Sequence, residues 1–228
     1  MHRTELGREP KRLDRGLLLG AATVALLVIG ACQSREEAPV ADQTPGATEA
    51  QEIPADPKAR EMARSFVQAV GAFDAERAVT YLADDAVVPE GLLPEELPLL
   101  ISFYEAQGYK QILDPCRVTG SFAYGTVVRC TFDFHAIRSN EIGLGPYHGS
   151  YWDLTISDGE IVEASQYWEI EKFSPQMWEP FAEWVSETYP NDFEVMYTGG
   201  GTNFRLTEES IRLWERHSQG YVEEVGRA

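Results

Sequence analysis

Residues 151–162 read YWDLTISDGEIV, two alternating apolar runs joined by Asp158-Gly159. An Asp-Gly pair between such runs is a strong signal for a two-residue β-hairpin, because both central residues of the turn adopt positive φ. Cross-strand counting around this turn pairs Ile156 with Ile161 and places Trp152, Leu154 and Ile156 on one face. The sequence therefore predicts antiparallel strands over residues 150–157 and 160–171.

A third strand is predicted over residues 125–137, because the sequence GTVVRCTFDFHAI alternates apolar and polar side chains. One face carries Val128, Cys130, Phe132 and Phe134. The other face carries Arg129, Thr131, Asp133 and His135. The first face reads as the buried one, and a further strand is expected over residues 111–118.

The two cysteines of these strands, Cys116 and Cys130, are expected to form a disulfide bond. A hairpin centred near Ala123 places each of them seven residues from its centre, so they face each other across the strands. A closed loop of about 15 residues would stabilise the fold by about 3 kcal/mol. Free buried thiols and a redox pair are the alternatives, and the redox alternative lacks a C-x-x-C motif.

Helices are expected on both sides of these strands. An apolar stripe with a period of 3.6 residues, including Met62, Phe66 and Val70, predicts a helix over residues 58–72. The sequence also predicts helices over 75–83, 94–107, 175–189 and 207–225, and a short strand over 86–88. Helices followed by antiparallel strands indicate an α+β fold with a C-terminal helical extension.

The start of the chain reads as an export signal. Four basic residues between Arg8 and Arg15 precede the apolar run 16–30, which is too short for a comfortable membrane span. The run ends in Ile29-Gly30-Ala31-Cys32, which resembles the bacterial lipobox. The resemblance implies that residues 1–31 are removed and that Cys32 carries the lipid anchor; an uncleaved signal anchor is the alternative. The expected location is the outer face of a bacterial cytoplasmic membrane, or the periplasm or outer membrane of a two-membraned cell.

The composition of the chain indicates its domain organisation and limits its possible partners. Residues 32–56 are rich in Ala, Glu, Pro and Thr and predict a disordered tether, which leaves residues 57–228 as one domain with extra helices from about 172. The formal net charge of the chain is −18. Five basic and three acidic residues precede Cys32, so the mature chain is near −20. This charge argues against nucleic-acid partners and against binding to anionic lipid surfaces through basic patches.

The order of these motifs resembles the SnoaL-like branch of the nuclear transport factor 2-like superfamily. The segment FVQAVGAFD at 66–74, the following AVTYLADDAV, and WDLTISDGEIV at 152–162 carry the resemblance, which covers residues 57–171. It implies a cone-shaped barrel of helices on a curved, mostly antiparallel mixed sheet, with an apolar pocket inside. Such domains include isomerases, dehydratases, cyclases and non-catalytic binding or assembly modules, so the fold alone does not decide function.

A catalytic residue cannot be assigned from the sequence. The resemblance implies a pocket Asp or His as general base, and the candidates are Asp133, His135, Asp153, Tyr167 and Glu169. Asp133, His135 and Asp153 lie opposite the apolar faces of their strands and are expected to point outward. His135, His148 and His217 lack the spacing of metal ligands, so neither a metal site nor a cofactor is expected.

The aromatic residues near the end of the predicted sheet are the candidate ligand site. Trp152, Tyr167, Phe132 and Trp178 are the pocket candidates; core packing is the alternative for the same residues. The favoured function is a lipid-anchored domain that binds a small apolar ligand or a partner without catalysis. The alternatives are a small isomerase, dehydratase or cyclase, and an assembly module that forms a homodimer through its sheet.

Overall fold

The computed structural model describes residues 56–89 and 91–227. The predicted signal peptide, the lipidation site Cys32 and most of the predicted tether lie outside the described residues. Three helices come first, interrupted by one strand: α1 (Pro57–Gly71), α2 (Ala75–Val79), β1 (Leu82–Val87) and α3 (Leu97–Ala106). Asp56 and Asp74 cap α1 and α2 by accepting hydrogen bonds from the amides of Ala59 and Arg77, at 2.9 and 3.1 Å.

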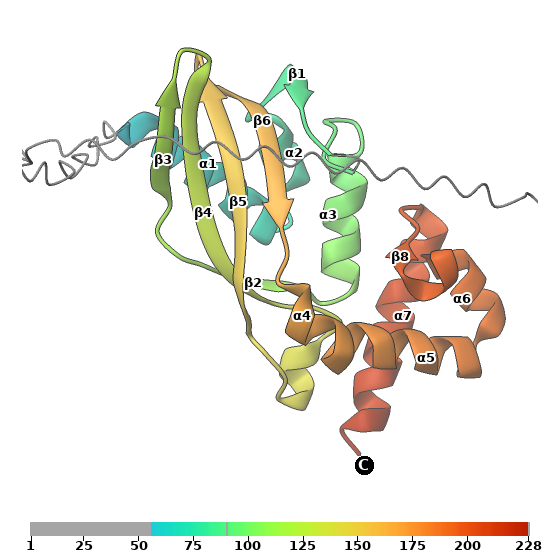
Figure 1. Cartoon of the computed structure of the whole chain (residues 1–228). Helices are drawn as coiled ribbons and strands as arrows, with labels where there is room; N and C mark the ends of the chain where they lie inside the picture. Colours follow the sequence, from blue (N-terminus) through green and yellow to red (C-terminus); the bar gives the residue numbers. More distant parts are fainter. Residues whose placement is uncertain (1–55, 90, 228) are drawn as a thin grey trace, which may run out of the picture. The chain divides into compact units, whose positions relative to one another are not determined.

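The remaining strands of the main sheet follow: β2 (Lys110–Leu113), β3 (Arg117–Phe122), β4 (Gly125–His135), β5 (Tyr147–Ser157) and β6 (Glu160–Tyr167). The strand order is β1-β6-β5-β4-β2, with β3 also paired to β4. Only the β1–β6 pair is parallel, so the six-stranded sheet is mixed and mostly antiparallel. Figure 1 shows this curved sheet with α1 and α2 behind it. The predicted fold class is confirmed.

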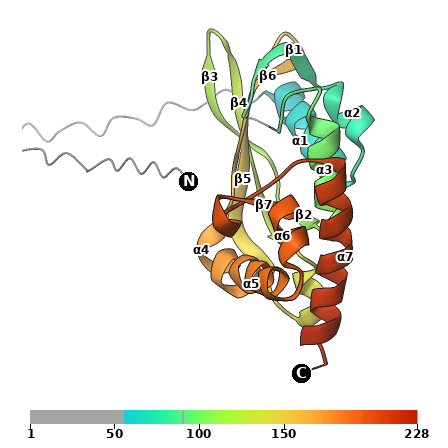
Figure 2. The ribbon, with the colours of Figure 1, turned by 90° about the vertical axis from the view of Figure 1, so that its right-hand side faces the viewer.

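The C-terminal extension is more elaborate than the two predicted helices. It contains α4 (Ile170–Phe173), a π-helical turn (Ser174–Trp178), α5 (Glu179–Thr188), α6 (Pro190–Met196) and α7 (Glu208–Val225). A small hairpin, β7 (Tyr197–Thr198) and β8 (Asn203–Phe204), connects α6 to α7. Figure 2 shows α7 running alongside α3. The extension therefore packs against the first part of the domain, and residues of both parts line the space between them.

The predicted β-hairpin around Asp158-Gly159 is confirmed. Both turn residues have positive φ, 52° and 91°, and Ile156 is opposite Ile161 as expected. Trp152, Leu154 and Ile156 are all buried. The strand ends at Tyr167 rather than 171, because Ile170 already begins α4.

Two strand predictions need correction. The segment 111–118 contains two strands, because Pro115 has no amide donor: the amide of Asp114 still donates to the carbonyl oxygen of Thr131, and the chain leaves the ladder at residues 115–116. The strand expected at 86–88 begins earlier, at Leu82. Leu82 and Ala83 belong to the helix predicted over residues 75–83, and this end of the helix prediction is wrong. The parallel pairing of Leu82 with Ile161 on β6 outweighs the local preference of this segment for helix.

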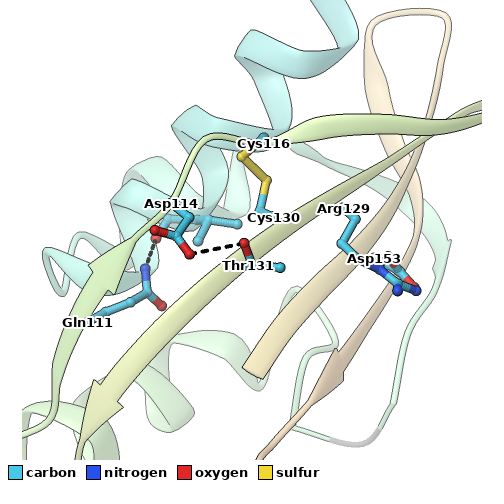
Figure 3. The surroundings of a disulfide bond; sticks show 8 residues. Gln111, Asp114, Cys116, Arg129, Cys130, Thr131 and Asp153 are labelled. Atoms are coloured by element: carbon cyan, nitrogen blue, oxygen red, sulfur yellow. Dashed lines mark hydrogen bonds and ion pairs between the residues drawn. A yellow bond between two sulfur atoms is a disulfide. The ribbon is translucent and has the colours of Figure 1, made fainter. Parts of the chain in front are cut away.

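The predicted disulfide bond between Cys116 and Cys130 is present, with the two Cα atoms 4.1 Å apart. A β-bulge at Thr119 produces this alignment, because the pairing changes by one residue between Val118 and Gly120. Beside the disulfide, Thr131 donates a hydrogen bond to Asp114, and Gln111 donates to the carbonyl oxygen of Val67 on α1 (Figure 3). The disulfide and the Thr131–Asp114 bond hold the β2–β3 connection to β4, and the Gln111 bond holds β2 to α1.

Candidate functional site

A cavity of about 480 Å³ lies between α3, the far ends of β4 and β6, and the C-terminal extension. Its size falls within the range of ordinary small-molecule sites. Eight of its lining residues are aromatic: Phe103, Tyr104, Tyr109, Phe134, Trp168, Phe173, Trp178 and Phe204. The other lining residues are Pro89, Leu92, Leu100, Gln107, Ala136, Gln166, Ile170, Ser174, Thr202 and Asn203.

One wall of the cavity belongs to the sheet. Phe134 on β4 packs edge-on against Trp168, with ring centroids 4.9 Å apart, and against Phe173 at 5.3 Å. Trp168 also meets the rings of Tyr104 and Tyr109 at 5.9 and 5.7 Å. Edge-to-face contacts of this kind are favourable beyond the burial of area, so the wall is a connected aromatic cluster.

The opposite wall belongs to the extension. Phe204 of β8 stacks on Phe103 of α3, with ring centroids 4.2 Å apart and an interplanar angle of 9°. The indole nitrogen of Trp178 donates a hydrogen bond of 2.9 Å to the carbonyl oxygen of Gly201. This bond joins the π-helical turn to the β7–β8 hairpin. The extension thus completes a cavity that the sheet and α3 only half enclose.

The polar side chains of the wall are neutral, and both tyrosine hydroxyls donate hydrogen bonds to glutamine side chains, whereas the amide nitrogen of Gln166 is buried without a hydrogen-bond partner among the described residues. The hydroxyl of Tyr104 donates to Oε1 of Gln166 at 3.1 Å, and the hydroxyl of Tyr109 donates to Oε1 of Gln111 at 3.0 Å. Burial raises the pKa of both phenols well above the ordinary value, and their proximity raises that of Tyr109 further. Both tyrosines are therefore uncharged at neutral pH.

No described residue that lines the cavity is an Asp, Glu, Lys, Arg or His. A general base needs a titratable group within hydrogen-bond reach of the reacting proton. The tyrosines do not fill this role, because their high pKa values keep them protonated. The arrangement can hold an uncharged ligand by burial and ring contacts, and it offers no base among the described lining residues.

The four residues predicted to line a pocket lie in three different environments in the structure. Trp178 lines the cavity. Trp152 is fully buried against Phe66, with ring centroids 5.5 Å apart, and Phe132 is 1% exposed behind Trp168. These two residues are core, which was the alternative expected for them.

Tyr167 requires a correction, because it lies on the outer face of the sheet and is 46% exposed. Strict alternation from Ile161 would place Tyr167 inward. The register of β5 and β6 shifts between Ile156 and Thr155, however, and this bulge reverses the faces of the following residues. Tyr167 consequently stacks on Tyr151 at 5.0 Å, and its neighbour Gln166 faces inward, opposite Trp152.

The catalytic candidates also lie outside the cavity. Asp133 is 2.7 Å from His148, and Asp153 accepts hydrogen bonds from Arg129, whose guanidinium lies over the Tyr151 ring. Nδ1 of His135 donates to the carbonyl oxygen of Leu144 at 3.0 Å. Glu169 caps α4 by accepting from the amide of Glu171. The outward orientation expected for Asp133, His135 and Asp153 agrees with these contacts.

Sequence reasoning missed most of the cavity wall. Phe103, Tyr104 and Tyr109 belong to or follow α3, and Phe204 lies in the β7–β8 hairpin, where the sequence predicts neither helix nor strand. The available signal was the apolar character of residues 97–104, LPLLISFY, which carries two adjacent aromatics. The cavity itself depends on how the extension packs, and no local pattern shows that.

Residues 56–89 and 91–227 contain no group of three or more His, Cys, Asp or Glu side chains arranged to hold a metal ion. None of their helices is both long enough and apolar enough to span a bilayer.

Comparisons with known proteins assign no family to this chain. No family model matches the chain, and no curated protein matches it. A candidate polyketide cyclase from Xanthomonas campestris pv. campestris is 14% identical with a TM-score of 0.40, over 52% of this chain and 96% of that one. TsrD from Streptomyces laurentii is 16% identical with a TM-score of 0.40, over 54% and 97%.

A third solved structure, an NTF2-like protein of unknown function from Cytophaga hutchinsonii ATCC 33406, is 14% identical with a TM-score of 0.36. It covers 53% of this chain and 98% of that one. At these identities and TM-scores the similarity carries no conclusion about activity or ligand. The function proposed for this chain is therefore based on the cavity and not on these similarities.

Proposed function

We propose that this chain is an exported lipoprotein, anchored through Cys32, whose α+β domain binds a small uncharged apolar ligand without catalysis. The observation that carries the binding role is the cavity of about 480 Å³ with eight aromatic residues and no ionised side chain among its described lining residues. Burying a ligand's apolar surface is favourable by about 25 cal/mol per Å². A charged ligand would lose its hydration without finding a counter-ion in this wall.

The resemblance of residues 29–32 to a lipobox supports the anchor, and the disulfide bond between Cys116 and Cys130 suits an oxidising compartment outside the cytoplasm. The alternative, a small isomerase, dehydratase or cyclase, requires an inward carboxylate or histidine. The geometry gives it no support, because Asp133, Asp153 and His135 are engaged on the other side of the sheet.

The binding role is tested first by native mass spectrometry of residues 32–228, secreted with the disulfide intact. A co-purifying neutral adduct of a few hundred daltons supports the proposal and identifies a compound to test for turnover. The same spectrum reports whether the chain is a monomer or a homodimer. In parallel, fluorescence titration with Nile red, an uncharged ring dye, measures access to the cavity.

Two adjacent residues provide a matched pair of variants for the dye titration. Trp168→Ala removes a ring from the cavity wall, whereas Tyr167→Ala removes a ring from the outer face. We expect Trp168→Ala to weaken dye binding at least several-fold and Tyr167→Ala to leave it unchanged. Circular dichroism establishes that both variants are folded. Equal effects of the two variants, or no dye binding to the parent chain, would contradict the binding site.

The anchor is tested separately by labelling the expressing cells with an alkyne analogue of palmitate. Incorporation into the full chain, and its loss in Cys32→Ala, is the expected result. An unlabelled parent chain would refute the lipoprotein assignment and leave the cavity argument intact.

A further inference from the structure

The hairpin between β3 and β4 ends in two exposed aromatic rings. Phe122 is 54% exposed and Tyr124 is 60% exposed, and the rings stack with centroids 5.1 Å apart and an interplanar angle of 2°. The ring of Phe122 also lies over Gly120, where an added Cβ would come within 2.5 Å of it. The two rings therefore have a defined orientation at the tip, although much of their surface contacts water.

This tip lies where the chain enters the domain. Thr126, two residues after Tyr124, donates a hydrogen bond of 3.1 Å to Asp56, the first described residue. Asp56 in turn caps α1. Figure 1 shows α1 behind the sheet, and α1 packs against β4, the strand that carries Thr126. Any anchor on the N-terminal side of Asp56 is thus connected to the domain next to the hairpin tip.

The length of the intervening chain limits the distance between the domain and the expected anchor. Cys32 and Asp56 are separated by 24 residues along the chain, a contour length of at most about 86 Å. Once one end of a molecule is tethered, a second contact becomes intramolecular and needs little affinity of its own. Two aromatic rings can then be sufficient to orient the domain.

The charge around the tip fits a lipid interface. Residues 118–128, VTGSFAYGTVV, contain no charged side chain although a quarter of the whole sequence is charged. Arg117 and Arg129 face each other at the base of this segment, and Arg117 forms no ion pair with another described residue. Aromatic rings sit favourably at the headgroup level, and a flanking arginine can reach the lipid phosphates.

We propose that the β3–β4 tip is a second membrane contact, which inserts Phe122 and Tyr124 into the headgroup region of a zwitterionic phospholipid surface. This inference rests on the proposed lipid anchor, because the tip alone offers too little apolar area for stable binding. The neighbouring β5–β6 turn carries Asp158 and Glu160, and the chain is strongly acidic. Anionic lipid is therefore expected to weaken the contact.

The test couples residues 32–228 to maleimide lipid in phosphatidylcholine vesicles. Cys32 is the only free thiol for this coupling, since Cys116 and Cys130 are joined. Hydrogen exchange of the segment 118–128 is compared with that of the same chain blocked at Cys32 by N-ethylmaleimide. We expect several-fold slower exchange in this segment on the vesicles, and a smaller effect when phosphatidylglycerol is added.

The double variant Phe122→Ser/Tyr124→Ser is expected to lose this protection. Ile112→Ser, which replaces a 51% exposed apolar residue on β2, is the matched control and should retain it. Equal exchange in coupled and blocked chains, or protection that survives in the double variant, would overturn the inference. Because the coupling is chemical, this result is independent of whether cells lipidate Cys32, which the palmitate experiment decides.

Discussion

The two faces of the central sheet differ in chemistry although they share the same strands. Along β4, Phe132 and Phe134 are 1% exposed on the inner face, whereas Arg129 and Asp133 lie half-exposed on the outer face. The inner side chains join an aromatic cluster with Trp168 and Phe173. The outer side chains pair with Asp153 and His148 from the neighbouring strand.

This difference separates the residues with catalytic chemistry from the cavity. Every ionisable candidate taken from the sequence is outside the cavity, and every described cavity residue is uncharged at neutral pH. A strand that alternates strictly can supply two unrelated surfaces, one for binding and one for solvent. The following predictions test how far this separation extends, beginning with the largest effect.

The two faces can be compared directly through adjacent residues of β4. Phe134→Ala should lower the free energy of unfolding by about 3–5 kcal/mol, because it removes a buried ring at the centre of the cluster. Asp133→Ala should cost less than about 1 kcal/mol, because its partner His148 is largely exposed. Urea unfolding measures both. Similar losses for the two variants would show that the faces are not energetically distinct.

The disulfide bond should contribute an intermediate amount. Its removal in Cys116→Ser/Cys130→Ser is expected to lower the free energy of unfolding by about 3 kcal/mol, since the unfolded chain regains the freedom of a loop of about 15 residues. Urea unfolding with and without reductant provides the measurement. The parent chain should respond to reductant and the double variant should not. A parent chain insensitive to reduction would contradict this contribution.

The buried phenols should make the inner face sensitive to alkali. The pKa values of Tyr104 and Tyr109 are raised in the folded chain, so their stabilising contribution is complete below the unfolded value of about 10 and is lost as the pH rises above it. The loss is at most about 1.4 kcal/mol per phenol and per pH unit. It is measured by urea unfolding between about pH 9 and 11.

The control for this pH dependence is Tyr104→Phe/Tyr109→Phe, which keeps both rings and removes both hydroxyl groups. Its free energy of unfolding should fall less steeply above about pH 10 than that of the parent chain. Identical slopes would mean that these phenols are not protected by burial, and the cavity wall would then be more hydrated than the structure indicates.

Local sequence patterns were sufficient to predict the β-hairpins. The Asp158-Gly159 turn fixes the register of β5 and β6 near the turn, and alternation in β4 identifies its buried face. Prediction failed where pairing partners overrode local preference, as for β1, whose first residues Leu82 and Ala83 were predicted to be helical. It also failed beyond the bulge in β6, which moved Tyr167 to the outer face.

The candidate site was less accessible to prediction than the fold. Trp178 was expected to line a pocket and does, but its partners Phe103 and Phe204 are 101 residues apart in the sequence and come together only in the folded chain. The inner position of Gln166 depends on the same bulge that moves Tyr167. Neither the contact between Phe103 and Phe204 nor the inward position of Gln166 produces a periodic pattern in the sequence.

The pairing of Cys116 with Cys130 was predicted from the sequence, but their alignment depends on the bulge at Thr119. The sequence by itself determined the α+β class, the outward orientation of Asp133, His135 and Asp153, and the acidic character of the surface. These follow from periodicity, turn chemistry and composition, which are properties of neighbouring residues. Only the tertiary structure decided that the C-terminal extension forms one wall of the cavity and that its described lining is largely aromatic and uncharged. The reason is physical: a cavity is defined by side chains from distant segments, and their contacts are set by packing of the whole domain.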